Sequence, residues 1–202
     1  MSSPLLTMSG ISKAFTGVQA LQNVNIQLRA GEVHALMGEN GAGKSTLMKV
    51  LIGVHKADEG YIQFKGQTVA FDSVLEAQKA GISMIFQELN LIPHLSVAEN
   101  IFFAREPLKN GLIDYKTMRT EAKKLLEMFD IDVEPTDIVN TLSVAKQQMV
   151  EIAKSLSFDV EILIMDEPTS ALTDREIDAL FELVDKLKAK GVAIVYISHR
   201  MN

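Results

Sequence analysis

The feature that most restricts the fold of this chain is an apolar run, a glycine-rich turn and a helix that follow one another directly. Val33–Met37 has the length and composition of a buried strand, GENGAGKST (38–46) forms the turn, and apolar residues recur at helical spacing after Lys44 as far as Ile52. Helices connected to strands by such turns cover both faces of a mostly parallel sheet. We therefore expect an α/β fold.

The rest of the chain repeats this alternation of strand-sized and helix-sized segments. Ile82–Phe86, Ile162–Met165 and Val192–Ile197 are further short apolar runs, and all are expected to be covered by helices on both faces, as is Val33–Met37. The stretch through Leu28 and the segment Tyr61–Phe71 alternate more weakly, which predicts antiparallel strands beside the main sheet.

Two helical regions are also visible in the sequence. Residues 88–157 are mostly helical in pattern, which suggests a helical subdomain inserted between core strands. Further along, Thr173 and Glu176 predict a capping box, and Gly191 predicts the end of that helix. Its expected buried stripe consists of Ile177, Leu180, Phe181, Val184 and Leu187.

Composition excludes several classes of protein. With 202 residues and 47% hydrophobic content, the chain suits one well-buried domain. The net charge of −6 gives no basic field for nucleic acid, which we do not expect as a partner. The absence of cysteine excludes disulfides and thiolate metal sites. The first residues do not form a secretory signal, and no apolar run reaches the roughly 20 residues that span a bilayer.

GENGAGKST fits the pattern G-x-x-x-x-G-K-[ST] in the strand, turn and helix context that this phosphate-binding motif needs. Backbone N–H groups of the turn and the helix N-terminus would surround phosphate oxygens, Lys44 would reach the β- and γ-phosphates, and Ser45 would bind Mg²⁺. An ordinary glycine-rich turn is the alternative, but it has no need for Lys-Ser. The residues expected to hold the nucleotide phosphates are Gly38, Glu39, Asn40, Gly41, Ala42, Gly43, Lys44, Ser45 and Thr46.

Polar side chains follow three of the other predicted strands. Asp166 and Glu167 end ILIMDEP (162–168), where Asp166 would hold Mg²⁺ and Glu167 would orient or deprotonate the attacking water. Gln87 could bridge Mg²⁺ and that water, and His199 could donate to the γ-phosphate, although each is weak evidence alone. Because ligands of open α/β sheets bind at the carboxyl ends of strands, these residues are expected to form one site.

Ser143 stands at the start of a further helix, in LSVAKQQMVEIAKSL (142–156). The simpler interpretation is a helix N-cap, the commonest reason for a serine at this place. The alternative is a contact with an anion, because free N–H groups at a helix start bind phosphate. The sequence pattern by itself leaves both open.

Taken in order, these motifs resemble the nucleotide-binding subunit of ABC transporters over essentially the whole chain. The matching segments are Phe15 as the adenine-stacking aromatic, GENGAGKST as Walker A, FQELNLIPHLSVAEN (86–100) as the Q-loop region, LSVAKQQ as the signature, ILIMDEP as Walker B, SALT (170–173) as the D-loop and His199 as the switch histidine. Within the family, QQMVEIAKSLS, MDEPTSALTDREID and IVYISHRM resemble the ATPases of ribose, galactose and arabinose importers.

The resemblance implies a RecA-like P-loop NTPase core with an N-terminal antiparallel β subdomain and an inserted helical subdomain, about residues 88–157. It implies ATP and Mg²⁺ as cofactors, Glu167, His199, Gln87 and Lys44 as catalytic residues, and Ser45, Gln87 and Asp166 at the metal. The expected partners are a second nucleotide-binding domain, permease subunits that contact Gln87–Leu95 and, indirectly, a periplasmic sugar-binding protein. The expected location is peripheral, on the cytoplasmic face of the inner membrane.

The chain departs from the family at the signature. Val144, Ala145 and Lys146 stand where the family has Gly, Gly and Gln, and valine obstructs the close approach to phosphate that glycine permits. Ser143 would therefore offer a poor signature to ATP bound by a partner domain. In the family, two such domains are often fused in tandem, and this chain resembles the first. We therefore expect residues 1–202 to form one nucleotide-binding domain that is truncated at its C-terminus. The rival functions are a non-transport ABC ATPase, a nucleotide-gated module without hydrolysis, and a nucleotide kinase.

Overall fold

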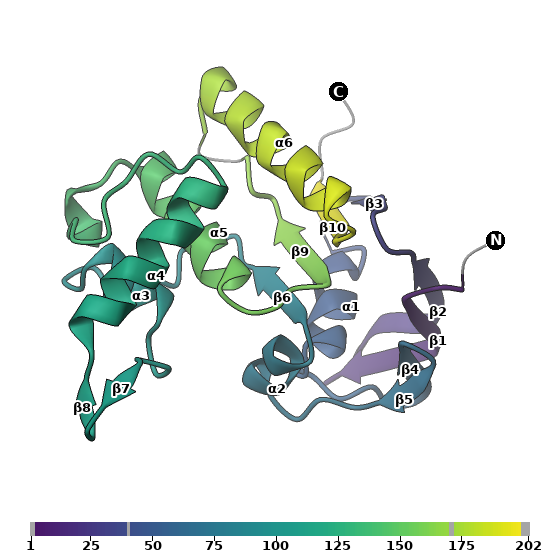
Figure 1. Ribbon diagram of the computed structural model, residues 1–202. Coiled ribbons are helices and arrows are strands. Elements are labelled where there is room, and N and C mark those ends of the chain that lie inside the picture. Colours follow the sequence, from purple (N-terminus) through teal and green to yellow (C-terminus); the bar gives the residue numbers. More distant parts are fainter. Residues whose placement is uncertain (1–2, 40, 170–171, 199–202) are drawn as a thin grey trace. The chain divides into compact units, whose positions relative to one another are not determined.

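The computed structural model describes residues 3–39, 41–169 and 172–198 (Figure 1). The chain divides into two compact units. The first consists of Met1–Met84, Val160–Glu167 and Val184–Asn202, and the second of Ile85–Asp159 and Pro168–Leu183, in each case as far as those residues are described.

An antiparallel sheet in the first unit contains β1 (Leu6–Phe15), β2 (Val18–Leu28), β4 (Glu59–Phe64) and β5 (Gln67–Val69), in the order β2-β1-β4-β5 (Figure 1). Leu6 pairs with Leu28 on one side and with Phe64 on the other. All three are buried, because the apolar side chains of neighbouring strands share one face of the sheet. The predicted antiparallel strands are confirmed.

A second sheet contains β3 (Val33–Met37), β6 (Ile82–Ile85), β9 (Ile162–Asp166) and β10 (Ala193–Ser198), in the order β3-β10-β9-β6. Strand β10 runs parallel to both of its neighbours, β3 and β9. Every residue of β6 and β9 is buried, which explains why the sequence shows unbroken apolar runs there.

The expectation that β3 is covered on both faces is wrong. This strand lies at one edge of the sheet, where Val33 and Met37 have 41% and 51% of their surfaces exposed. A short apolar run has the same composition at an edge as at the centre of a sheet, so the sequence pattern does not distinguish them.

Helices α1 (Lys44–Leu51) and α2 (Val74–Lys79) belong to the first unit. Helix α6 (Asp174–Ala189) follows the predicted cap, where the Glu176 carboxylate accepts hydrogen bonds from the backbone N–H and the hydroxyl of Thr173, both at 2.8 Å. Gly191 adopts the left-handed conformation expected after a helix end. The predicted buried stripe needs two corrections. Ile177 is only partly buried, and Phe181 is 46% exposed while Leu183 is buried instead.

The second unit is built mainly from helices, which are α3 (Val97–Ile101), α4 (Tyr115–Met128), the 3₁₀ helix η1 (Val139–Thr141) and α5 (Val144–Leu156). A small hairpin of β7 (Leu108–Lys109) and β8 (Leu112–Ile113), which the sequence pattern did not indicate, precedes α4. Helix α3 contacts both α4 and α5. Among the helices that the structure describes, none combines the length and the apolar character needed to cross a bilayer.

Glu151 of α5 is an unusual core residue, because it is ionisable and yet only 4% of the residue is exposed. Burial raises its pKa above the ordinary value of 4.5 for glutamate, an effect that Lys154 partly opposes. A raised pKa in the folded state means that the protein binds a proton more tightly when folded, so this group favours folding at acidic pH and loses that contribution as pH rises through its folded pKa. A substitution that removes the charge of Glu151 should therefore change the stability of the fold only above about pH 4.5.

We expect Glu151→Gln to raise the melting temperature at pH 7 and to change it little near pH 4, because the amide carries no charge to desolvate. Thermal unfolding of both proteins between pH 4 and 8 measures this difference. Glu127→Gln, on the exposed face of α4, serves as the control. If the difference in melting temperature between Glu151→Gln and the wild type stays constant with pH, burial of the charge is not its cause.

Candidate functional site

The glycine-rich turn between β3 and α1 forms a cradle, by which we mean residues 38–46. Gly43 is the N-cap of α1 in the left-handed conformation, with φ of 83°, and the first turn of the helix contains no acidic residue. The N–H groups of a first helical turn have no partner within the helix and carry a partial positive charge. The turn is therefore suited to bind an anion.

Gly43 also packs against β2, a contact that the motif does not reveal. A Cβ atom at this position would lie 2.5 Å from the backbone oxygen of Ala20 and 2.9 Å from Cδ2 of Leu21. The left-handed conformation and the close contact both require glycine here. The cradle is thus fixed to the antiparallel sheet at this residue.

We expect Gly43→Ala to destabilise the chain by about 2 kcal/mol or more. The left-handed conformation alone costs a non-glycine residue about 1–2 kcal/mol, and the overlap with a strand backbone adds to that cost. Gly66→Ala is the matched control, because Gly66 has φ of +76° but nothing within 4 Å of an added Cβ. Urea unfolding measures the free energy of unfolding of both variants. If both lose the same amount of stability, the contact of Gly43 with β2 has no role.

Lys44 lies over the cradle that precedes it. Its Nζ atom donates hydrogen bonds to the backbone oxygens of Gly38, at 2.6 Å, and Glu39, at 2.9 Å. The ammonium group is therefore held close to the backbone of the turn. Asn40, a predicted member of the cradle, lies outside the described residues.

Asp166, the last residue of β9, meets the start of α1. Its carboxylate accepts a hydrogen bond from the side chain of Ser45, and only 8% of the residue is exposed. Burial raises the pKa of Asp166, while the Ser45 hydrogen bond, Lys49 and Lys44 oppose this shift and Glu167 adds to it. The structure thus brings together the hydroxyl and the carboxylate that were both predicted to bind Mg²⁺.

Glu167 follows Asp166 in the left-handed conformation, with φ of 49°. Its backbone N–H donates to the oxygen of Ile197 in β10, at 3.1 Å. A non-glycine residue in this conformation costs free energy, and such residues cluster at functional sites. The turn changes the direction of the chain directly after the strand, at the same edge of the sheet as Asp166.

The register of the parallel sheet explains why the cradle lies at the same edge of the sheet as the acid pair, by which we mean Asp166 and Glu167. Asp166 is paired with Ile197, and Ser198 is paired with Met37, the residue before the cradle. Because the three strands run in the same direction, their carboxyl ends meet at this edge. His199, which follows β10, lies outside the described residues.

Phe15 ends β1 with 40% of its surface exposed. The ring of His55 contacts it edge to face, with centroids 4.9 Å apart, and Nζ of Lys13 lies 5.6 Å from its centroid. Asp58 holds Lys13 in an ion pair at 2.6 Å. Sequence reasoning assigned no chemistry to His55, and no sequence signal marks it, because the fold alone brings it to Phe15.

Gln87 and Ser143 belong to the second unit. Gln87 is exposed and lies two residues beyond the end of β6. Ser143 is the N-cap of α5, where its side chain accepts a hydrogen bond from the backbone N–H of Lys146 at 3.3 Å. The capping interpretation of Ser143 is confirmed, and the anion contact stays a prediction.

A hollow of about 380 Å³ adjoins Ser143 in the second unit. Its apolar lining includes Ile131 and Met149, and Lys146 at its rim pairs with Asp132 at 3.1 Å. Val144, which stands where the family has glycine, is 51% exposed next to Ser143. Its branched side chain is therefore at the protein surface beside the N-cap of α5.

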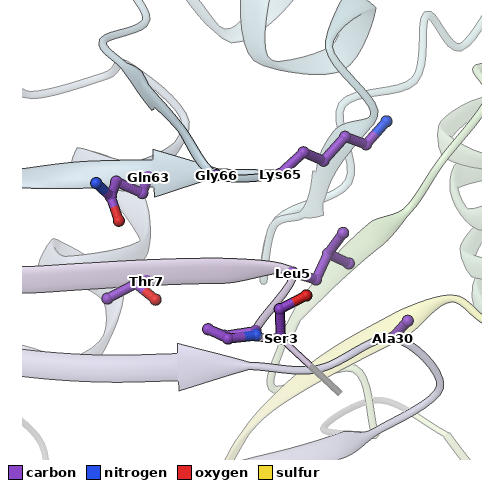
Figure 2. Close-up of a pocket in the computed structure, with 8 residues that line it drawn as sticks. Ser3, Leu5, Thr7, Ala30, Gln63, Lys65 and Gly66 are labelled. Atoms are coloured by element: carbon purple, nitrogen blue, oxygen red, sulfur yellow. The ribbon is translucent and has the colours of Figure 1, made fainter.

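Another hollow, of about 540 Å³, lies beside the antiparallel sheet (Figure 2). Thr7 of β1 and Gln63 of β4 are paired neighbours at its wall, and Lys65 forms an ion pair with Glu161. None of the predicted site residues lines it. Within the described residues, no group of three or more His, Cys, Asp or Glu side chains could hold a metal ion.

Comparison with known families decides the assignment. Residues 21–170 match the family described as ABC transporter, which is well over half of the chain. The chain belongs to the ABC transporter family. The matched span of the family includes the cradle, Gln87, Ser143 and the acid pair.

Named relatives extend this family assignment. The chain is 57% identical over 197 residues to a ribose import ATP-binding protein of Chromobacterium violaceum, and 53% identical over 197 residues to a galactose/methyl galactoside import ATP-binding protein of Photobacterium profundum. These matches cover 97% and 98% of this chain but 39% of each relative. The chain thus spans about two fifths of the length of these relatives.

Solved structures of the family have the same fold. An ATP-binding cassette of an ABC transporter in its ADP conformation has a TM-score of 0.87 at 29% identity, covering 100% of this chain and 83% of that chain. A dimeric cassette in a post-hydrolysis state, bound to ADP and Pi, has a TM-score of 0.82 at 27% identity, covering 98% of this chain and 89% of that chain. The predicted P-loop NTPase fold is confirmed.

Proposed function

We propose that this chain binds ATP with Mg²⁺, hydrolyses it to ADP and phosphate, and thereby drives import of a monosaccharide. The observation that carries the proposal is the hydrogen bond between Ser45, at the start of α1, and the buried carboxylate of Asp166, with Glu167 next to it. One edge of the sheet would then carry a cradle that binds phosphate, oxygen ligands for a hard cation, and a carboxylate that positions the attacking water.

The residues present fit a nucleotide with Mg²⁺. Hydroxyl and carboxylate oxygens are the ligands that Mg²⁺ prefers, and it completes its coordination with water and substrate phosphates, so two protein ligands are enough. Ser45 and Asp166 would hold the ion, with Gln87 as a further ligand, and the bound ion would neutralise charge on the phosphates. Lys44 and the N–H groups of residues 41–46 would bind the phosphate oxygens, and Phe15 would stack on the base.

Hydrolysis requires a group that positions the attacking water. Glu167 would accept a proton from this water or orient it, Gln87 would help to hold it, and His199 would donate to the γ-phosphate. Transfer to water rather than to a second substrate distinguishes this proposal from a nucleotide kinase. The left-handed backbone conformation of Glu167 supports the role, because residues in such costly conformations cluster at functional sites.

The proposed substrate class comes from the named relatives, which import ribose or galactose and methyl galactoside. The transporter would also contain a second nucleotide-binding domain, permease subunits and a periplasmic sugar-binding protein. The helical region of about residues 88–157 would form the subdomain that meets the permease, at Gln87–Leu95. Through these partners the chain would lie at the cytoplasmic face of the inner membrane, as a peripheral subunit.

Ser143 would face ATP bound by the partner domain. Its hydroxyl oxygen already accepts from Lys146, and Val144 covers the adjacent surface, so the signature that this chain offers is a poor one. The two ATP sites of the assembly would then be unequal. Ser143→Ala should reduce turnover by the assembled transporter much less than Glu167→Gln does, and equal losses would count against unequal sites.

Uptake of labelled ribose and galactose tests the transport function directly. Cells that lack the gene for this chain should lose uptake of one of these sugars, and the wild-type gene should restore it. If uptake of both sugars is unchanged while the purified chain binds ATP, the chain is an ABC ATPase with another task.

A further inference from the structure

Three polar side chains of the second unit have no part in the proposed chemistry. They are Asn100 of α3 and Glu151 of α5, which are buried, and Lys154 of α5, which is partly buried. Buried polar groups are costly unless they are hydrogen-bonded, so their partners indicate what they do. All three bind the backbone of one segment, residues 88–96, which we call the 88–96 loop.

Asn100 uses both ends of its amide on this loop. Its Oδ1 accepts from the backbone N–H of Ile92 at 2.7 Å, and its Nδ2 donates to the backbone oxygens of Ile92 at 3.0 Å and Ser96 at 3.1 Å. A loop without regular structure normally satisfies its backbone groups with water. Here a buried side chain does so, and this ties the loop to α3.

Glu151 and Lys154 bind the peptide groups of Asn90 from one turn of α5. The backbone N–H of Asn90 donates to the Glu151 carboxylate, and Nζ of Lys154 donates to the Asn90 oxygen at 2.8 Å. Residues three apart on a helix lie on the same face, so the two side chains hold Asn90 together. Oε2 of Glu151 has no hydrogen-bond partner among the described residues, so the loop contact keeps a carboxylate in a costly position.

The loop is also bonded to η1. The backbone N–H groups of Asn140 and Val139 donate to the oxygens of Pro93 and Leu95, at 3.0 and 3.1 Å. Two residues after η1, Ser143 begins α5, the helix that carries Glu151 and Lys154. A displacement of the loop would therefore act on α5 at both its start and its middle, and a helix transmits such a displacement along its length as a rigid element.

We propose that Asn100, Glu151 and Lys154 are positioning residues, which fix the 88–96 loop to α3 and α5 so that a force on this loop reaches Ser143. The proposal rests on the proposed function, in which the permease contacts this loop. It explains why α5 has a charged pair facing a loop where apolar side chains would pack at lower cost.

Hydrogen exchange in the 202-residue chain tests the anchoring by itself. We expect Glu151→Ala and Asn100→Ala to speed amide exchange across the 88–96 loop at least tenfold. Glu151→Gln should have little effect, because glutamine still accepts from Asn90. Ile152→Val, which loosens α5 through its buried apolar face, is the control for general destabilisation.

Turnover in the assembled transporter tests the coupling. For Glu151→Ala and Lys154→Met we expect ATP affinity and unstimulated turnover within twofold of wild type, but stimulation by sugar-loaded binding protein reduced at least fivefold. Ile152→Val should keep its stimulation. Unchanged loop exchange in Glu151→Ala, or stimulation lost equally in Ile152→Val, would overturn the proposal. Wild-type protein that neither binds nor turns over ATP would instead overturn the proposed function, while loop exchange would still decide the anchoring.

Discussion

Lys44→Ala should weaken ATP binding by this chain by about a hundredfold or more. The ammonium group already lies over the cradle, within 2.9 Å of two backbone oxygens of the loop that would surround the phosphates. Hydrogen bonds to charged groups contribute about 1.5–3 kcal/mol each, and a loss of about 3 kcal/mol corresponds to more than a hundredfold in the dissociation constant. Isothermal titration with MgATP measures the change.

The control for this change is Lys79→Ala, an exposed lysine in the last turn of α2, which should bind ATP like the wild type. If both variants retain wild-type affinity, Lys44 does not contact the nucleotide. Circular dichroism should show that Lys44→Ala remains folded, since the hydrogen bonds of its side chain to Gly38 and Glu39 lie within its own loop.

Glu167→Gln should have the second large effect, on turnover instead of binding. General acid–base catalysis by one side chain contributes about 10²–10⁴-fold, so the assembled transporter should lose at least a hundredfold in ATP hydrolysis. Glutamine has nearly the shape of glutamate and keeps the backbone N–H that bonds to Ile197, so the left-handed turn should persist. Steady-state phosphate release and MgATP titration of the same preparation separate the two effects.

Glu182→Gln, on an exposed position of α6, is the control for glutamate replacement in general. Turnover that survives in Glu167→Gln would assign the base to another residue. Binding and turnover lost together would mean that Glu167 supports the nucleotide site itself. We expect Lys44→Ala to lose affinity for MgATP and Glu167→Gln to retain it.

Much of the site can be read from the sequence because its parts are local. The strand, turn and helix around GENGAGKST specify the cradle, and ILIMDEP specifies a buried strand that ends in two acids. Parallel pairing of the strands then brings the cradle and the two acids to one edge of the sheet. The contact between Ser45 and Asp166 therefore depends on the order of the strands in the sheet, although the two residues are far apart in the sequence.

The features that could not be predicted depend on which segments pack together. Val33 and Met37 are exposed because β3 lies at an edge of the sheet, and the same letters would suit a central strand. His55 reaches Phe15 only through the fold of the first unit. Phe181 is 46% exposed and Leu183 is buried, although Leu180, Val184 and Leu187 of the same helix are buried as the spacing predicted.

The most direct test of the central claim is an amide NMR titration of this chain with MgATP. The account predicts large shifts for the N–H groups of Gly41–Thr46, with the same residues shifted by MgADP and far less by adenosine, because the cradle binds phosphate. If saturating MgATP leaves these amides unshifted, or if adenosine shifts them as strongly, the cradle does not bind a triphosphate and the proposed ATPase is contradicted.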